Sequence, residues 1–134
     1  MNAYHDLQEL DPDECWELLA SVSVARVGLA VDDRIDVLPV NHTVVGRHVA
    51  WLSAAGTKLG VAAAQQPVGL EADGIDHDGR TGWSVLVHGT ARIVTDPDLE
   101  QQLHDAEVTP WAAPDRRTMW IEVADPVISG RRVG

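Results

Sequence analysis

The sequence of 134 residues is poor in cysteine, lysine and most aromatic residues. Cys15 is the only cysteine, which excludes an intrachain disulfide and a cysteine-rich metal site. Phenylalanine is absent and tyrosine occurs once, whereas tryptophan occurs five times. Several indole N–H groups therefore need a protein partner, water or a ligand. Lys58 is the only lysine among the ten basic residues. The composition explains why lysine is rare but not why the one lysine occurs at this position.

The balance of charge is strongly acidic, with 21 acidic against 10 basic side chains and a net charge of −11. Such a charge repels nucleic acid and anionic membranes, so we expect neither as a partner. No apolar run approaches the roughly 20 residues of a membrane span. The polar segment Met1–Leu10 lacks the pattern of a signal peptide. We therefore expect a cytoplasmic protein, with residues 1–134 forming a single domain.

The chain begins with a helix signal and continues with strand signals. Asp11 suits an N-cap, Pro12 the first helical position, and Glu14 completes a capping pattern. A second helix is expected over Pro97 to Ala106, and a short one between Ala54 and Gln66. The segment Val108 to Arg117, which holds Trp111, reads as irregular. Strands are expected over Val24 to Val31, Arg34 to Val45, His48 to Ser53, Val68 to Ile75, Trp83 to Val94, and Thr118 to Val123 with a continuation towards Ser129.

The connections between these strands favour hairpins. Asp32-Asp33 marks one turn, and Gly46-Arg47, with glycine first, suits a type II′ turn. About six strands in hairpin order, with two or three short helices, bury their apolar faces best by antiparallel pairing and barrel closure. The sequence therefore predicts a mainly β protein.

One candidate site is the stretch from Ser53 to Lys58, which carries Gly56 and Thr57. A strand ends here and a helix is expected to begin near Thr57, which would offer unpaired N–H donors to an anion. A bound phosphate would explain a lysine in a first helical turn, where the helix dipole disfavours it. A surface helix with a solvated lysine explains the pattern as well.

Another candidate surrounds Pro39, which belongs at a sheet edge or bulge because it lacks a backbone donor. Asn41 and His42 follow on opposite faces of the strand and could hydrogen-bond a polar heterocycle. Alternatively, His42 is a partly buried strand residue with satisfied hydrogen bonds, the commoner fate of a lone histidine.

Trp83 and Ser84 open the longest strand, where Trp83 could pack on a flat ligand and Ser84 could donate to a phosphate; core packing explains them equally. The acidic stretch from Glu71 to Gly79 fits neither an EF-hand nor a zinc motif, so we expect no metal site. Arg131 and Arg132 could contact a phosphate or form a solvated basic end.

Taken in order, these segments resemble the pyridoxamine 5′-phosphate oxidase-like family of FMN-binding split barrels, in its short actinobacterial-type branch. The resemblance covers nearly the whole chain and rests on the order and spacing of its pieces. These are ECWELL at 14–19, DVLPVN at 36–41, GTKL at 56–59, GWSVLVHG at 82–89 and GRR at 130–132.

This resemblance implies a six-stranded antiparallel split β-barrel of the Greek-key type. It also implies a homodimer with two FMN sites at the subunit interface. The FMN phosphate would be held by Ser53, Thr57 and Lys58, and the isoalloxazine ring lined by Pro39, Val40, Asn41 and His42. Trp83 and Ser84 would complete the site from the partner chain.

The resulting functional hypothesis is an FMN-dependent oxidoreductase acting on a small molecule, with NAD(P)H as a possible electron donor. His42 is the best guess for a catalytic side chain. The chain lacks the C-terminal R-x-H type substrate motif of authentic pyridoxamine 5′-phosphate oxidases, which leaves the substrate open. Two alternatives stand beside this hypothesis. One is a module that stores or senses flavin; the other is a split barrel that binds haem, through His42 or His88, or the deazaflavin coenzyme.

Overall fold

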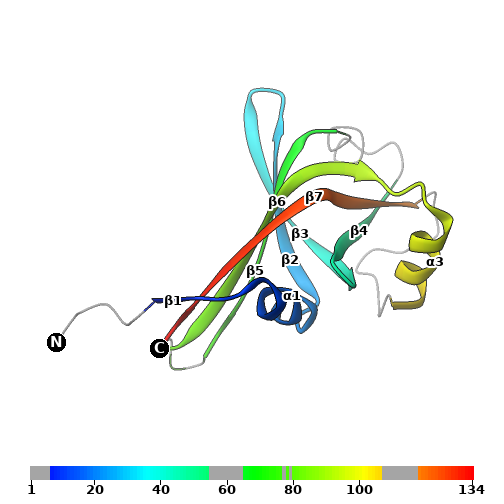
Figure 1. Ribbon diagram of the computed structural model, residues 1–134. Helices are drawn as coiled ribbons and strands as arrows, with labels where there is room; N and C mark the ends of the chain where they lie inside the picture. The colour runs from blue at the N-terminus through cyan, green and yellow to red at the C-terminus, as the bar shows by residue number, and fades with distance from the viewer. Residues whose placement is uncertain (1–6, 55–64, 77, 79, 107–117) are drawn as a thin grey trace.

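The computed structural model describes residues 7–54, 65–76, 78, 80–106 and 118–134 (Figure 1). Two helices and seven strands lie within these residues. In chain order they are β1 (Leu7–Glu9), α1 (Pro12–Ala20), β2 (Val24–Val31), β3 (Arg34–Val45), β4 (His48–Ala54), β5 (Pro67–Ile75), β6 (Gly82–Ile93), α3 (Pro97–Ala106) and β7 (Thr118–Val133). The helix expected between 54 and 66 and the irregular segment with Trp111 lie outside the described residues.

Helix α1 forms as its sequence predicts. The Asp11 side chain accepts a hydrogen bond from the Glu14 N–H at 2.9 Å, and Pro12 occupies the first helical position. The helix ends at Ser21, whose backbone N–H donates to the Leu18 carbonyl. On its apolar stripe, Cys15 and Leu19 are fully buried in the main core, and Leu18 packs partly buried against it. Capping and amphipathicity therefore agree with the tertiary packing.

Six of the strands close into an antiparallel barrel. Their order is β7-β4-β3-β2-β5-β6, and β6 pairs back with β7 to complete the ring. Strands β2, β3 and β4 follow one another through tight turns, and β5 returns to lie beside β2, which is a Greek-key arrangement. This confirms the six-stranded antiparallel split barrel. The additional strand β1 pairs with the end of β7.

Both predicted hairpin turns are present. Asp32 has a φ of 55°, in the left-handed region that aspartate tolerates, at the turn between β2 and β3. Gly46 has a φ of 59° between β3 and β4, while Arg47 has no positive φ. A positive φ at the first central residue alone is what a type II′ turn requires.

Strand β7 continues as expected, through a bulge, and runs past Ser129 to Val133. The register with β6 pairs His88 with Val127 but Thr90 with Ala124, so β7 carries one extra residue at this point. Asp125, with a φ of 50°, accommodates the irregularity. The first part of β7 pairs with β4 and β6, and the second with β6 and β1 (Figure 1).

The barrel interior forms the main hydrophobic core, closed on one side by α1. A second, smaller cluster lies outside the barrel, where α3 packs Leu99 and Leu103 against Ala50 and Trp120 of the sheet. Within the described parts of the chain, no helix is long and apolar enough to cross a membrane.

Candidate functional site

One face of the sheet carries several of the predicted site residues. We define the outer face as the side of β2, β3, β5, β6 and the end of β7 that points away from the barrel interior. Residues paired across an antiparallel sheet share a face, so the register identifies its members. One row across it consists of Val37, Gly28, Gly69, His88 and Val127.

Apart from His88, this row is apolar, and its valines are exposed. Val37 is 63% exposed and Val127 67% exposed, and Ile35 on the same face is 75% exposed. Gly28 and Gly69 have no side chains to raise the surface between them. The His88 ring lies over Gly69, where an added Cβ would meet its Cδ2 at 3.8 Å. Apolar groups exposed together in this way are typical of an interaction surface.

The next row of the outer face is charged. Arg26 forms ion pairs with Glu71 at 3.2 Å and with Asp73 at 3.5 Å. Burial raises the pKa of the Glu71 carboxyl, and the neighbouring Asp73 raises it further, while Arg26 lowers it. The outer face therefore presents both signs of charge beside its apolar row.

Pro39 and Asn41 also lie on the outer face, as the pairing of Pro39 with Arg26 requires. Pro39 is exposed. The Asn41 Nδ2 group donates to the Ser23 carbonyl at 3.3 Å, whereas its Oδ1 atom has no hydrogen-bond partner in the part of the chain that the structure describes. This oxygen is shielded from solvent within the chain.

Val40 and His42, in contrast, point into the barrel interior, where both side chains are buried. The His42 Nε2 atom lies 2.8 Å from the Leu19 carbonyl oxygen in the last turn of α1. Burial lowers the pKa of the His42 imidazole, although the hydrogen bond to Leu19 opposes this shift. The histidine is therefore a neutral core residue that joins α1 to β3.

Trp83 and Ser84 point to opposite sides of β6. Ser84 pairs with Asp73 and Arg131 on the outer face. Trp83 packs against the core, and its indole lies over Gly74, where an added Cβ would sit 2.5 Å from Nε1. The two neighbours therefore cannot contact the same side of a ligand within one chain.

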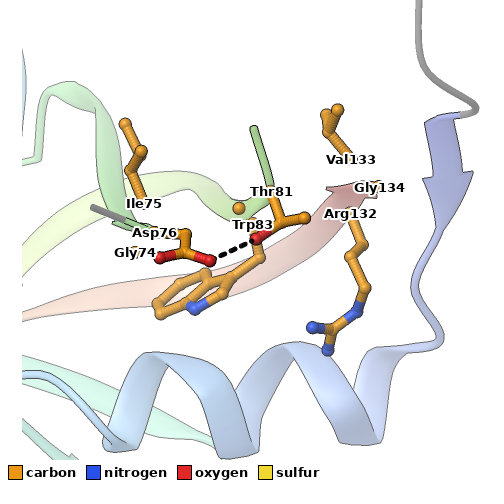
Figure 2. Close-up of a pocket in the computed structure, with 9 residues that line it drawn as sticks. Gly74, Ile75, Asp76, Thr81, Trp83, Arg132, Val133 and Gly134 are labelled. Carbon is orange, nitrogen blue, oxygen red and sulfur yellow. Dashed lines mark hydrogen bonds between the residues drawn. The ribbon is translucent and has the colours of Figure 1, made fainter. Parts of the chain in front are cut away.

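Trp83, with residues at the end of the β5–β6 hairpin and of β7, lines a cavity of about 380 Å³ (Figure 2). Arg132 extends from β7 towards α1, where its Nη2 donates to Glu14 at 2.9 Å. Thr81 donates to Asp76 at 3.2 Å on the other side of the cavity. Sequence reasoning missed the partnership of Glu14 with Arg132, because 118 positions separate them and no local pattern connects them.

The remaining predicted site residues are the three assigned to the phosphate, Ser53, Thr57 and Lys58. Ser53 is 6% exposed and faces the barrel interior. Thr57 and Lys58 lie outside the described residues, so the phosphate site at this segment stays a prediction. Over residues 7–54, 65–76, 78, 80–106 and 118–134, no group of three or more metal-binding side chains occurs.

The closed antiparallel barrel with one covering helix defines the class of protein as a split barrel. Comparison with known proteins then identifies the family. Residues 11–132 match the family model described as pyridoxamine 5′-phosphate oxidase. The chain belongs to this family.

Individual relatives extend the likeness over the whole chain. An uncharacterized protein of Mycobacterium tuberculosis is 34% identical over 96% of this chain and 86% of its own length. The structure of the FAD binding protein from Mycobacterium smegmatis is 40% identical, with a TM-score of 0.81, over 95% of this chain and 100% of that one. A protein of unknown function from Corynebacterium diphtheriae is 26% identical, with a TM-score of 0.76, over 96% of this chain and 98% of that one.

Proposed function

We propose that this protein binds a flavin, FMN in the first instance, and uses it for electron transfer to or from a small molecule in the cytoplasm. The observation that carries the proposal is the full-length likeness, at 40% identity, to a FAD binding protein. When bound, the flavin supplies the hydride or electron transfer, and the protein supplies binding and orientation.

The outer face fits such a ligand chemically. Gly28 has no side chain that would obstruct a planar ring, and the His88 ring covers the neighbouring Gly69. Ser84 and Arg131 add a hydroxyl and a guanidinium on the same face. In this proposal Thr57 and Lys58 contact the phosphate of the flavin. On this arrangement His42 does not contact the flavin, because its ring points away from the outer face and its Nε2 bonds the Leu19 carbonyl of α1.

FMN and FAD differ only beyond the first phosphate. Both share the isoalloxazine ring, the ribityl chain and that phosphate, so the same outer-face residues serve either. Resemblance to the family favours FMN, whereas the name of the relative from M. smegmatis favours FAD. Titration with both therefore belongs to the test.

We also propose that the protein is a homodimer whose outer faces meet, with the flavin sites at the interface. A twofold contact brings a surface against its own copy, so it must complement itself. The outer face meets this condition. It combines an exposed apolar row around Val37 and Val127 with Arg26 beside Glu71 and Asp73.

The binding test is a titration of the purified protein with FMN, FAD and riboflavin, monitored by flavin fluorescence and absorption. We expect one flavin per chain. Arg131→Gln should weaken FMN binding at least several-fold, while Arg80→Gln, an exposed arginine in the β5–β6 loop, should not. A folded protein that binds none of the three flavins would refute the proposal, and haem and the deazaflavin coenzyme would be tested next.

The turnover test adds NADPH or NADH to the loaded protein. Bleaching of the flavin absorption, with recovery in air, supports the oxidoreductase. Tight binding without reduction by these or other donors would favour a storage or sensing role. Light scattering at two protein concentrations measures the dimer independently of flavin.

Lys58→Ala tests the phosphate assignment separately. If Lys58 contacts the phosphate, the variant should lose affinity for FMN and keep its affinity for riboflavin, which has no phosphate. Equal FMN affinity in the variant and the parent protein would remove Lys58 from the site. Because Lys58 is the only lysine, this single change removes all lysine side chains from the protein.

A further inference from the structure

The inner wall of the barrel carries two polar rings side by side in an otherwise apolar core. His42 on β3 pairs directly with Trp51 on β4, so their side chains share the interior face. His42 is 7% exposed and Trp51 1% exposed. Around them lie aliphatic side chains of the main core, among them Val40 and Val49.

Each ring has one polar atom without a partner in the described part of the chain. These are His42 Nδ1 and Trp51 Nε1, and both are fully shielded from bulk solvent. Buried polar atoms in native proteins nearly always have a hydrogen-bond partner, supplied by the protein or by an ordered water. The two atoms belong to one cross-strand pair on the interior face, where a single small molecule can serve as the partner of both.

The hydrogen-bond roles of the two atoms are determined by chemistry. Because His42 Nε2 lies 2.8 Å from the Leu19 carbonyl oxygen, which only accepts, Nε2 carries the proton. In a neutral imidazole the other nitrogen, Nδ1, is then an acceptor. The indole Nε1–H of Trp51 is a donor only. The wall thus offers one donor and one acceptor.

We propose that His42 Nδ1 and Trp51 Nε1 hold one buried water molecule, which accepts from the indole and donates to the imidazole. An anion does not fit, because a neutral Nδ1 repels it and cannot donate. A cation does not fit either, because the indole N–H cannot accept. The site selects a small neutral group that both donates and accepts, and water is the smallest.

This water would link three elements. Through His42 it would hold the imidazole in the tautomer that bonds the last turn of α1, and through Trp51 it would connect β3 to β4. The site lies on the opposite side of β3 from Pro39 and Asn41, so it is independent of flavin binding on the outer face.

The test is nuclear magnetic resonance of the ¹⁵N-labelled protein without added flavin. We expect the His42 spectrum to show a protonated Nε2 and a bare Nδ1, and the Trp51 indole proton to show a cross-relaxation signal with a long-lived water. Oxygen-17 relaxation dispersion should count one long-lived water fewer in Trp51→Phe. Trp120→Phe is the matched control, since Trp120 Nε1 donates to His104 at 3.4 Å and should leave the count unchanged.

The measurement on the unmodified protein decides the matter even where a variant fails to fold. A protonated Nδ1, or a Trp51 indole proton with no long-lived water within reach, would overturn the assignment. So would an unchanged water count in folded Trp51→Phe.

Discussion

Replacing Gly89 by alanine tests the close approach of β6 to the bulge in β7. A Cβ built at Gly89 would lie 2.4 Å from the Ala124 carbonyl oxygen and 2.5 Å from Val123 Cγ1. Backbone oxygen cannot move aside as a flexible side chain can, so the bulge itself must shift. Overpacking of this kind costs about 1–3 kcal/mol, and the backbone contact suggests a loss of about 2 kcal/mol or more.

The matched control is Gly69→Ala on the neighbouring strand β5. A Cβ at Gly69 would meet His88 Cδ2 at 3.8 Å, which is an ordinary van der Waals contact. Neither glycine has a positive φ, so backbone strain contributes to neither change. Since glycine destabilises a strand interior by roughly 0.5–1 kcal/mol relative to alanine, Gly69→Ala should be neutral or stabilising.

Urea unfolding monitored by tryptophan fluorescence measures both variants. With a slope of about 2 kcal/mol per molar urea, Gly89→Ala should lower the midpoint by about 1 M or more, at unchanged slope. Gly69 lies on the proposed dimer face, so each curve is repeated at two protein concentrations to separate folding from association. A Gly89→Ala midpoint within about 0.2 M of the parent protein would refute the steric argument.

Three further predictions concern other groups in the fold. Glu122 is 4% exposed and accepts hydrogen bonds from Arg92 Nε at 3.3 Å and Nη2 at 3.1 Å. Urea unfolding of Glu122→Gln should show a loss of about 1–2 kcal/mol in the free energy of unfolding. This value is kept small because the Arg92 side chain is more than half exposed to solvent. A loss no larger than that of Glu100→Gln on exposed α3 would contradict this interpretation. The pKa of His42 is lowered from its ordinary value of 6.5, so the unfolded chain binds the proton more readily. The stability that the neutral ring provides is complete above about pH 6.5 and declines as the pH falls towards the folded-state pKa. His42→Gln should flatten this decline, whereas His88→Gln, at an exposed histidine, should not. Identical stability profiles against pH in the parent protein and both variants would contradict the role given to the His42 ring. Asp11→Ala removes the N-cap of α1 and should cost about 1 kcal/mol, whereas Asp11→Ser should restore most of it; equal losses in the two variants would exclude a capping role.

The local signals in the sequence were sufficient for the elements whose ends are set by neighbouring residues. The N-cap at Asp11 and the glycine-first turn at Gly46 act through backbone geometry within a few positions, and both appear as predicted. Helix α3 spans the predicted residues Pro97–Ala106. Antiparallel barrel closure was predictable from the number and order of the strands.

The arrangement of the candidate site depended on contacts between distant residues. Strand β1 was not predicted, because three exposed residues carry no strand pattern of their own and pair only when the end of β7 is beside them. The continuation of β7 towards Ser129 was expected, but the bulge at Asp125 and the last residues up to Val133 were not, because they depend on the pairing with β6.

Alternation in the sequence determined that Asn41 and His42 point to opposite sides of β3, and that Trp83 and Ser84 do so on β6. It did not determine which side is the core. Only the closed barrel decided that His42 is buried against α1 while Asn41 is presented outward, because the choice of face depends on the strands and helix that pack there. Local chemistry therefore determined the elements and their two faces, and tertiary packing decided which of those faces is available to a ligand.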